Sequence, residues 1–299
     1  MNIIDKIRRQ TGTKQPLTQD DLNRYKMHIE NLSKDKDIFS YTYPNLTEKD
    51  IAFIKKMIYN HKYSKKVKPL AIQLAQYVGV ESLLYLALNL YDIKLFRGRK
   101  FVNHGSYWSI IDGQYMPVEN LIIYNNKEAL SHELIHLSSN AKNTKLKTYH
   151  LGFSYCLGDK TFFRALNEGF TELLCRRIFH NSDYKNADSY KLNIYFARLL
   201  ELLYENQKDA EQDYFKANFL GPINNFTKFS TLEHYHDLCK QLDSVNYIND
   251  TEKDLELLKP LNDVIKKTDD AKKIDKANEI TEEYLESTNK IKTKIFTKN

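Results

Sequence analysis

Residues 131–137 read Ser131-His132-Glu133-Leu134-Ile135-His136-Leu137, with two histidines four positions apart among apolar residues. On a helix, this spacing places both imidazoles on one face, where together they can bind a single metal ion. Glu133 is rotated by about 100° from His132, so its carboxylate lies beside the ion and can take a proton from water. The alternative is an ordinary amphipathic helix, but polar groups on a largely buried helix are costly without partners.

A second segment, further along the chain, reads Leu166-Asn167-Glu168-Gly169-Phe170-Thr171-Glu172. A catalytic zinc ion usually takes three protein ligands and keeps one position for water. Glu168 is the natural candidate for the third ligand. Glu172 follows four residues later, so the two carboxylates share one face of a helix. Together, the two segments predict a complete zinc site.

The two segments resemble the His-Glu-x-x-His and Asn-Glu-x-x-x-Glu motifs of gluzincin metallopeptidases, the class that includes thermolysin and the zinc aminopeptidases related to aminopeptidase N. The resemblance implies that Glu168 binds zinc and that Glu172 hydrogen-bonds the free ring nitrogen of His132. Asn167 is expected beside the ligands, in their outer surroundings. Physical chemistry supports the role of Glu172, because a carboxylate behind a ligating histidine fixes its tautomer and raises its basicity. The alternative for Glu172 is a solvated helix carboxylate.

The resemblance covers mainly residues 119–180, and the flanking sequence matches neither thermolysin nor the aminopeptidases. More loosely, residues 132–179 are similar to a group of uncharacterised bacterial proteins classed as metallopeptidases, whose second motif reads Leu-Asn-Glu-Gly-Tyr-Thr-Glu-Leu-Leu. This similarity supports the chemistry and supplies no substrate. The glycine and histidine that extend the metzincin motif are absent, because Ser139 and Lys142 occupy those positions.

Length and composition indicate what class of protein carries this site. With 299 residues and 41% apolar content, the chain can bury a core, as one domain or two subdomains. No run of about eighteen apolar residues occurs, so no membrane span is expected. Charged residues interrupt positions 1–10, so a secretory signal is not expected either. Three cysteines show neither a disulfide framework nor a metal-pair spacing: Cys156, Cys175 and Cys239. A cytoplasmic protein with reduced thiols is the simplest interpretation, and leaderless export stays open.

The sequence predicts an α+β fold that is predominantly α-helical. The resemblance to gluzincins implies a zincin-like arrangement, with a small β-sheet before the active-site helix and a helical C-terminal subdomain. Four segments are expected: an N-terminal helical and polar segment (1–66), an upper subdomain with the sheet and the first motif (67–145), a lower helical subdomain with the third ligand (146–249), and a long C-terminal helix (250–299).

The only convincing β region is residues 92–124, where turn glycines separate three short strands expected at 92–99, 106–111 and 118–124. In zincins, a strand before the active-site helix borders the cleft and pairs with an extended peptide. Residues 121–124 are therefore expected to recruit a peptide as an edge strand, with a purely structural strand as the alternative. Residues 141–162 are expected to form a loop that returns the chain to the metal.

The rest of the sequence is typical of helices. Apolar stripes and capping patterns predict them at 18–33, 47–58, 69–88, 186–207, 208–219, 229–245 and 252–293. Gly79 is expected to split the helix at 69–88, and Pro260 to break or kink the last one. The pair Gly221-Pro222 is expected to mark a turn.

These residues predict a zinc-dependent peptidase. Zinc held by His132, His136 and Glu168 would bring the pKa of bound water toward neutrality, and Glu133 would act as the general base. A further donor should stabilise the negative charge on the carbonyl oxygen, and gluzincins often take it from a tyrosine or histidine of the C-terminal subdomain. The candidates, each more readily explained as a core tyrosine or a surface histidine, are Tyr195, His234 and His236.

Two other classes of function remain open. A catalytically inactive zinc-binding protein could use the cleft to bind a peptide or partner, although a structural site would not need Glu133. A nucleic-acid-binding helical protein would rest on the basic run at 62–68, which a solvated loop explains better at a net charge of only +6. The expected partner is a peptide or protein substrate, and nucleic acid is not expected. The sequence specifies neither the substrate, nor endopeptidase against exopeptidase action, nor the oligomeric state.

Overall fold

The computed structural model describes residues 47–60, 65–91, 93–103, 108–143, 148–157, 160–180, 190–245 and 251–296. These residues form an α+β structure in which helices predominate, as the sequence predicts. The helix expected at 18–33 lies outside the described residues. The division of the chain into four segments stays a prediction.

Three helices begin the described chain: α4 (Glu48–Asn60), α5 (Val67–Tyr77) and α6 (Val80–Tyr91). The predicted helix start at Thr47 is confirmed, because its carbonyl oxygen accepts a hydrogen bond from the N–H of Ile51. Gly79 separates α5 from α6, as predicted. The buried apolar residues of α5 and α6 include Leu70, Leu74, Leu83, Leu86 and Leu90.

A three-stranded sheet has the order β1-β5-β4, with β1 (Lys94–Arg97), β5 (Leu121–Tyr124) and β4 (Gly113–Met116). β5 pairs parallel with β1 and antiparallel with β4. The prediction of an edge strand at 121–124 is therefore wrong, because β5 is the central strand. All four of its residues are buried, which is typical of a strand covered on both faces. The edge strand that contacts the first motif is β4 instead.

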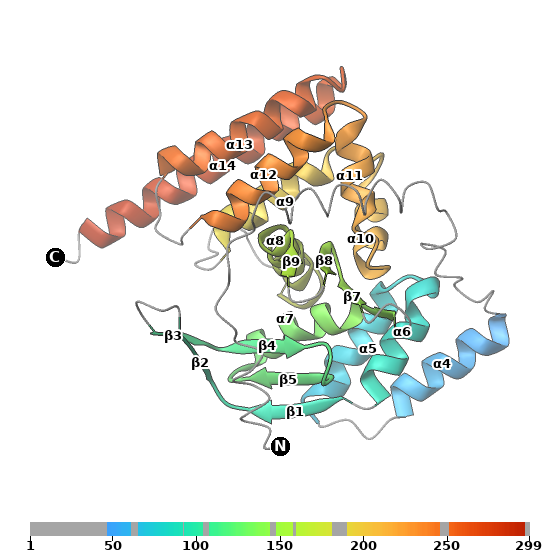
Figure 1. The fold of residues 1–299 in the computed structure, drawn as a ribbon. Coiled ribbons are helices and arrows are strands. Elements are labelled where there is room, and N and C mark those ends of the chain that lie inside the picture. Colours follow the sequence, from blue (N-terminus) through green and yellow to red (C-terminus); the bar gives the residue numbers. More distant parts are fainter. Residues whose placement is uncertain are drawn as a thin grey trace.

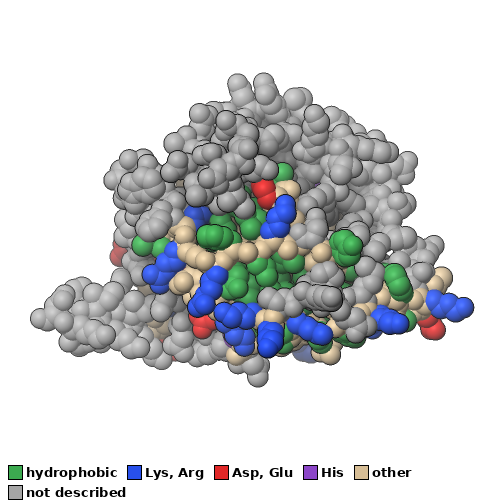
Figure 2. Space-filling view, turned by 90° about the horizontal axis from the view of Figure 1, so that it is seen from below, with side chains coloured by type: hydrophobic (Ala, Val, Ile, Leu, Met, Phe, Trp, Pro, Cys, Tyr) green, Lys and Arg blue, Asp and Glu red, His purple; other side chains and the backbone are tan. Residues whose placement is uncertain are grey.

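The opposite edge of the sheet, β1, lies at the bottom of Figure 1. Its residues Lys94, Phe96 and Arg97 are exposed. Figure 2 views the molecule from this side and shows many Lys and Arg side chains, with few acidic ones, around a hydrophobic area. Charged side chains on an edge strand oppose pairing with a further chain. A separate hairpin of β2 (Lys100–Asn103) and β3 (Trp108–Ile111) connects β1 to β4.

Helix α7 (Lys127–Ser138) carries the first motif and follows β5 directly. It begins at Asn126, whose side chain accepts a hydrogen bond from the N–H of Ala129 at 2.8 Å, a normal helix cap. Every residue from 130 to 138 is buried, because α7 packs against β4 and β5 on one side and against α5, α6 and α8 (Arg164–Cys175) on the others.

A four-stranded antiparallel sheet lies between the two motifs. Its strands follow in sequence order: β6 (Asn140–Asn143), β7 (Thr148–Leu151), β8 (Ser154–Leu157) and β9 (Lys160–Phe162). The predicted loop at 141–162 is therefore wrong. Gly152 lies in a turn, and the segments on either side of it pair as short strands. Gly152 makes the β7–β8 turn with a positive φ of 54°, which glycine adopts without steric cost.

The second motif lies on α8, which ends in a π-helical turn, η1 (Arg176–His180). The next helix, α9 (Lys191–Glu201), packs along α8. The guanidinium of Arg177 donates to both carboxylate oxygens of Glu201 at 2.7 Å and to Glu211 at 3.1 Å. This charged group ties η1 to α9 and to α10 (Gln207–Phe215).

Four more helices complete the upper part of Figure 1: α11 (Leu220–Thr227), α12 (Leu232–Ser244), α13 (Thr251–Lys266) and α14 (Ala271–Phe296). The turn predicted at Gly221-Pro222 is wrong: both residues lie in the first turn of α11, where proline loses no helical hydrogen bond. The sequence predicts a break or a kink at Pro260. The break is wrong, since Pro260 lies inside α13, and the kink stays a prediction. The chain reverses at Asp269, which has a φ of 55°, before α14.

One continuous cluster of buried apolar residues extends from α4 to α14 through the helices that carry both motifs. Among the residues that the structure describes, no helix has the length and apolar character needed to cross a bilayer. Cys175 and Cys239 are buried free thiols, in line with a packing role.

Candidate metal centre

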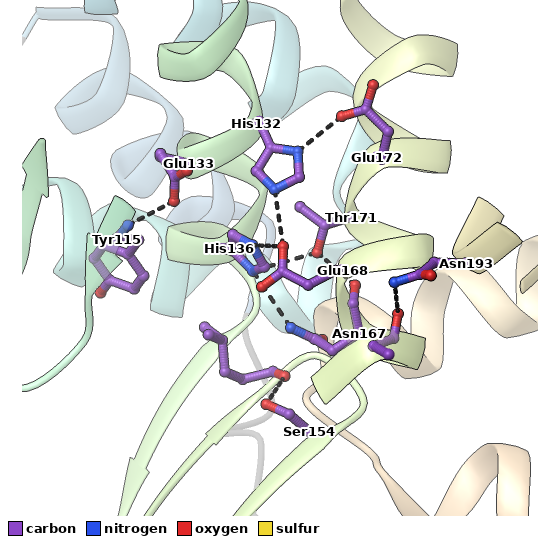
Figure 3. A network of polar contacts seen from close by, with 12 residues as sticks. Tyr115, His132, Glu133, His136, Ser154, Asn167, Glu168, Thr171, Glu172 and Asn193 are labelled. Atoms are coloured by element: carbon purple, nitrogen blue, oxygen red, sulfur yellow. Dashed lines mark hydrogen bonds and ion pairs between the residues drawn. The ribbon is translucent and has the colours of Figure 1, made fainter. Parts of the chain in front are cut away.

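Three side chains from two helices meet at one point (Figure 3). His132 and His136 project from α7, and Glu168 projects from α8. The carboxylate oxygen Oε2 of Glu168 lies 3.2 Å from Nε2 of His132 and 3.3 Å from Nε2 of His136. One possible ligand atom from each residue lies within 4.8 Å of the other two. The structure therefore brings together the three residues that the sequence marks as metal ligands.

The three groups are not equally buried. The side chains of His132 and His136 are 10% and 5% exposed, whereas that of Glu168 is 17% exposed. The histidines face inward because α7 is enclosed by the sheet and by α8. Glu168 is thus the most exposed of the three side chains.

The outer ring nitrogen of His132 faces a carboxylate. Nδ1 of His132 lies 2.8 Å from Oε2 of Glu172, and the other oxygen of Glu172 accepts a hydrogen bond from Nε of Arg176 at 2.7 Å. The carboxylate accepts the Nδ1 proton, so Nε2 is left for a metal. The ring of Tyr190 stacks on the His132 imidazole with centroids 5.7 Å apart and an interplanar angle of 14°. Tyr190 itself has a left-handed backbone, with φ 57°.

The outer ring nitrogen of His136 faces hydroxyl groups. Oγ1 of Thr171 lies 3.2 Å from Nδ1 of His136, 2.5 Å from the hydroxyl of Tyr214 and 2.7 Å from the carbonyl oxygen of Asn167. These distances fit a single pattern: Thr171 donates to Asn167 and accepts from both His136 and Tyr214. His136 then also keeps Nε2 for a metal. Burial raises the pKa of Tyr214, which keeps this hydroxyl protonated.

Asn167 also lies in this group. Its Nδ2 is 3.4 Å from Nδ1 of His136, and its Oδ1 accepts a hydrogen bond from the N–H of Phe153 at 3.0 Å. A Cβ atom at Gly152 would lie 2.3 Å from Oδ1 of Asn167 and 2.4 Å from the ring of Tyr214. Only glycine fits there, so the β7–β8 turn holds Asn167 and Tyr214 in place.

Glu133 lies beside the three ligands and points toward β4. Its Oε2 accepts a hydrogen bond from the N–H of Tyr115 at 2.5 Å. Gly113 allows this approach, because a Cβ atom there would lie 2.7 Å from Oε1 of Glu133. Burial raises the pKa of Glu133, and the charges on His132 and His136 oppose that rise. A buried carboxylate with a raised pKa is a stronger base than an exposed one.

The charged side chains at the centre shift one another's pKa values. Burial alone would lower the pKa of His132, but its hydrogen bonds to Glu168 and Glu172 outweigh burial and raise it well above 6.5. Burial alone would raise the pKa of Glu168, but the charge on His136 and the hydrogen bonds from both histidines lower it well below 4.5. The pKa of Glu172 is lowered in the same way, chiefly by His132. A divalent cation would replace the shared protons of this cluster.

The donor set fits zinc. Two imidazole nitrogens and one carboxylate oxygen are the ligand types that zinc accepts, and three protein ligands are typical of catalytic sites. Both histidines have a partner for the outer nitrogen, as zinc-binding histidines usually do. The sequence identifies Glu172 in this role. It does not identify Thr171 and Tyr214, although Thr171 lies inside the second motif, four residues after Asn167.

The three candidates for a donor to the carbonyl oxygen have other surroundings. The hydroxyl of Tyr195 donates to Glu283 of α14 at 2.9 Å. Nδ1 of His234 lies 2.7 Å from the hydroxyl of Ser230. The ring of His236 is buried against Phe163 and Tyr235. These contacts lie within the helical part of the molecule and not at His132, His136 and Glu168.

Comparisons with known proteins found no relative of this chain. The chain matches no protein-family model, no curated protein and no solved structure.

Proposed function

We propose that this chain is a zinc-dependent peptidase in which His132, His136 and Glu168 hold the metal. The observation that carries the proposal is the convergence of these three side chains with Glu133 beside them. A site that served only folding would need the ligands alone. Here a buried carboxylate with a raised pKa stands next to them, held by the N–H of Tyr115.

The residues of the chain divide the chemistry between them. Bound zinc would supply a Lewis acid that lowers the pKa of water and polarises a carbonyl group. Glu133 accepts the proton of the attacking water and delivers a proton to the leaving amine. Glu172 and Thr171 keep the two imidazoles in the Nδ1-protonated form, with Nε2 directed at the metal.

The arrangement of elements supports a zincin-like architecture as part of this proposal. A small sheet precedes α7, and the third ligand comes from the helical part that follows. The strand that would pair with an extended peptide is β4. Asn125 donates to the carbonyl of Asp112 at 2.7 Å, and backbone groups alternate along an antiparallel pair. Gly113 and Tyr115 therefore direct their N–H and C=O groups away from β5. The N–H of Tyr115 is bonded to Glu133, so a peptide would pair with the groups of Gly113 and with the carbonyl oxygen of Tyr115.

Metal analysis and peptide profiling test this proposal. The purified protein is expected to contain about one zinc ion per chain, since one such ligand set is described, and to cleave members of a peptide mixture followed by mass spectrometry. Glu133→Gln should keep the zinc and lower kcat by at least about a hundredfold, because general-base catalysis contributes roughly that much. Glu128→Gln, an exposed carboxylate in the first turn of the same helix, is the matched control and should leave kcat unchanged.

Two outcomes would reject the proposal. Activity of Glu133→Gln close to that of wild type would remove the assigned base. Bound zinc with no cleavage of any peptide would favour the inactive zinc-binding alternative.

A further inference from the structure

Exposed apolar side chains are concentrated around strand β1. Within the part of the chain that the structure describes, six large apolar side chains are exposed, and four of these belong to residues 91–118. These four are 51% to 64% exposed: Tyr91, Phe96, Ile110 and Val118. A single exposed apolar residue is normal on a protein surface, whereas a group of them marks an interaction site.

Backbone contacts place two of these side chains near the beginning of β1. The N–H of Lys94 donates to the carbonyl oxygen of Asn120 at 2.9 Å, and the side chain of Asn120 donates to the carbonyl oxygen of Asn89 at 2.7 Å. Tyr91 follows Asn89 by two residues, and Val118 precedes Asn120 by two residues. The end of α6 and the β4–β5 turn therefore bring Tyr91 and Val118 close to the beginning of β1.

The other two apolar side chains lie toward the end of β1. The ring of Phe96 lies close to Gly98, since a Cβ atom there would be 2.8 Å from it. Ile110 comes two residues before Asp112, whose carboxylate pairs with Nε of Arg99 at 3.0 Å, two residues beyond the end of β1. The four apolar side chains thus follow the length of one exposed strand.

Positive charges accompany these apolar side chains. Lys94 and Arg97 belong to β1 and are exposed, and neither has an ion-pair partner among the described residues. Arg99 is also exposed, and Asp112 balances its charge. Glu119 is the other acidic residue from β1 to β5, and it is half-buried. Figure 2 shows the result on this face, where many Lys and Arg side chains and few acidic ones surround a hydrophobic area.

We propose that the β1 edge, defined as β1 with Tyr91, Ile110 and Val118, binds the surface of a membrane that contains anionic lipids. Lys94 and Arg97 attract the negative headgroups, and the apolar side chains enter the boundary between the headgroups and the acyl chains. This inference goes beyond the proposed peptidase function and does not depend on it.

Other partners fit this surface less well. Two copies of the chain would bring identical basic edges together, and charged side chains on an edge strand oppose pairing. A nucleic acid would engage the cations through its phosphates but would leave the aliphatic side chains of Ile110 and Val118 in water. A membrane surface satisfies the charges and the apolar area together.

The order of the sheet makes this binding compatible with access to the candidate metal centre. β5 separates β1 from β4, and β4 is the strand whose Tyr115 contacts Glu133. A membrane bound at β1 therefore occupies the edge of the sheet opposite to the one that a peptide would pair with.

Co-sedimentation of the full chain with lipid vesicles tests the inference. Vesicles of phosphatidylcholine alone are compared with vesicles that also contain phosphatidylserine. Each Lys or Arg near an anionic surface strengthens binding about fivefold, so the two unpaired cations should give a partition coefficient about 25-fold higher for the vesicles with phosphatidylserine. Added salt should weaken this binding, because salt screens exposed charges.

Variants assign the binding to the β1 edge. The double variant Lys94→Gln/Arg97→Gln should lose most of the preference for phosphatidylserine. Phe96→Ser should weaken binding about fivefold, because the exposed half of an aromatic side chain no longer enters the membrane, whereas Phe96→Leu should keep most of the binding. Lys259→Gln is the matched control, because Lys259 is exposed on α13, at the opposite end of the molecule in Figure 1, and it should leave binding unchanged.

Three outcomes overturn the inference: equal binding to the two kinds of vesicle, a preference for phosphatidylserine that survives the double charge variant, and binding by Phe96→Ser as strong as by the wild type. Preferential binding of a DNA duplex over the anionic vesicles, or a dimer that Phe96→Ser dissociates in analytical ultracentrifugation, also overturns it, in favour of that partner.

The charge variants keep the test valid where Phe96→Ser fails to fold, and urea denaturation of each variant checks its fold. The measurement needs neither zinc nor a peptide. A protein that cleaves no peptide but binds anionic vesicles through the β1 edge would therefore reject the peptidase and keep this inference.

Discussion

The two histidines of α7 have the same proposed role as metal ligands and different surroundings. His132 is backed by a carboxylate, Glu172, which is itself paired with Arg176. His136 is backed by the hydroxyl of Thr171, which also binds the buried hydroxyl of Tyr214. One histidine therefore faces a charged group near the surface and the other a neutral network in the core.

This difference separates metal affinity from fold stability. A carboxylate behind an imidazole increases its basicity and strengthens its bond to a metal. A neutral hydroxyl fixes the ring without adding charge, and its loss leaves other buried donors without an acceptor. We expect changes around His132 to alter zinc binding, and changes around His136 to alter the folded protein as well.

The largest effect is expected for Thr171→Val. The substitution keeps the shape but removes the acceptor of two buried donors, His136 Nδ1–H and the hydroxyl of Tyr214. Each buried unsatisfied group costs about 1–3 kcal/mol, so the free energy of unfolding should fall by about 3 kcal/mol in urea denaturation of the zinc-free protein. Thr227→Val, whose hydroxyl bonds only to backbone carbonyls of its own helix, is the control and should lose less than about 1 kcal/mol. Equal losses of unfolding free energy in the two variants would show that the hydroxyl network adds nothing to stability.

A smaller effect, on zinc rather than on folding, is expected for Glu172→Gln. Loss of the charge behind His132 should weaken zinc binding by about 10- to 100-fold, as is usual for an outer partner of a ligand. Competition with a fluorescent chelator measures the dissociation constant. Glu279→Gln, which removes a carboxylate from an exposed pair with Lys276, should change nothing. If Thr171→Val, in its folded fraction, weakened zinc binding more than Glu172→Gln, the contrast between the two histidines would be reversed.

The smallest effect is expected for Tyr190→Leu, which removes the ring stacked on His132. Such ring pairs contribute about 0.5–1.5 kcal/mol beyond their buried area, so zinc affinity should fall by roughly three- to tenfold. Tyr190→Phe keeps the stack and should bind zinc like the wild type. A loss in Tyr190→Phe as large as in Tyr190→Leu would assign the effect to the hydroxyl and not to the stacked ring.

The sequence predicts the ligands because helical periodicity is a local property. A spacing of four residues places His132 with His136, and Glu168 with Glu172, on one face whatever the rest of the fold does. The same reasoning identifies the helices before and after the site. Contacts between distant segments have no such signal, so neither the contact of Tyr214 with Thr171 nor the hydrogen bond from Tyr115 to Glu133 could be predicted.

The strand errors have a similar cause. The apolar residues 121–124 fit an edge strand or a central strand equally well until the partners are known, and the structure pairs them on both sides. The segment 141–162 is rich in polar residues and glycine, so its short strands lack a clear alternation. The sequence alone therefore predicts an edge strand at 121–124, whereas β4 is the edge strand beside β5.

The π-helical turn η1 connects the surroundings of His132 to the helices α9 and α10. Arg176 and Arg177 are consecutive, yet the first holds Glu172 behind His132 and the second holds Glu201 and Glu211 in the neighbouring helices. Inserting or deleting one residue in this short turn would disengage both arginines together. A change in η1, which contributes none of the proposed ligands, is therefore expected to weaken zinc binding and the packing of α9 and α10 together.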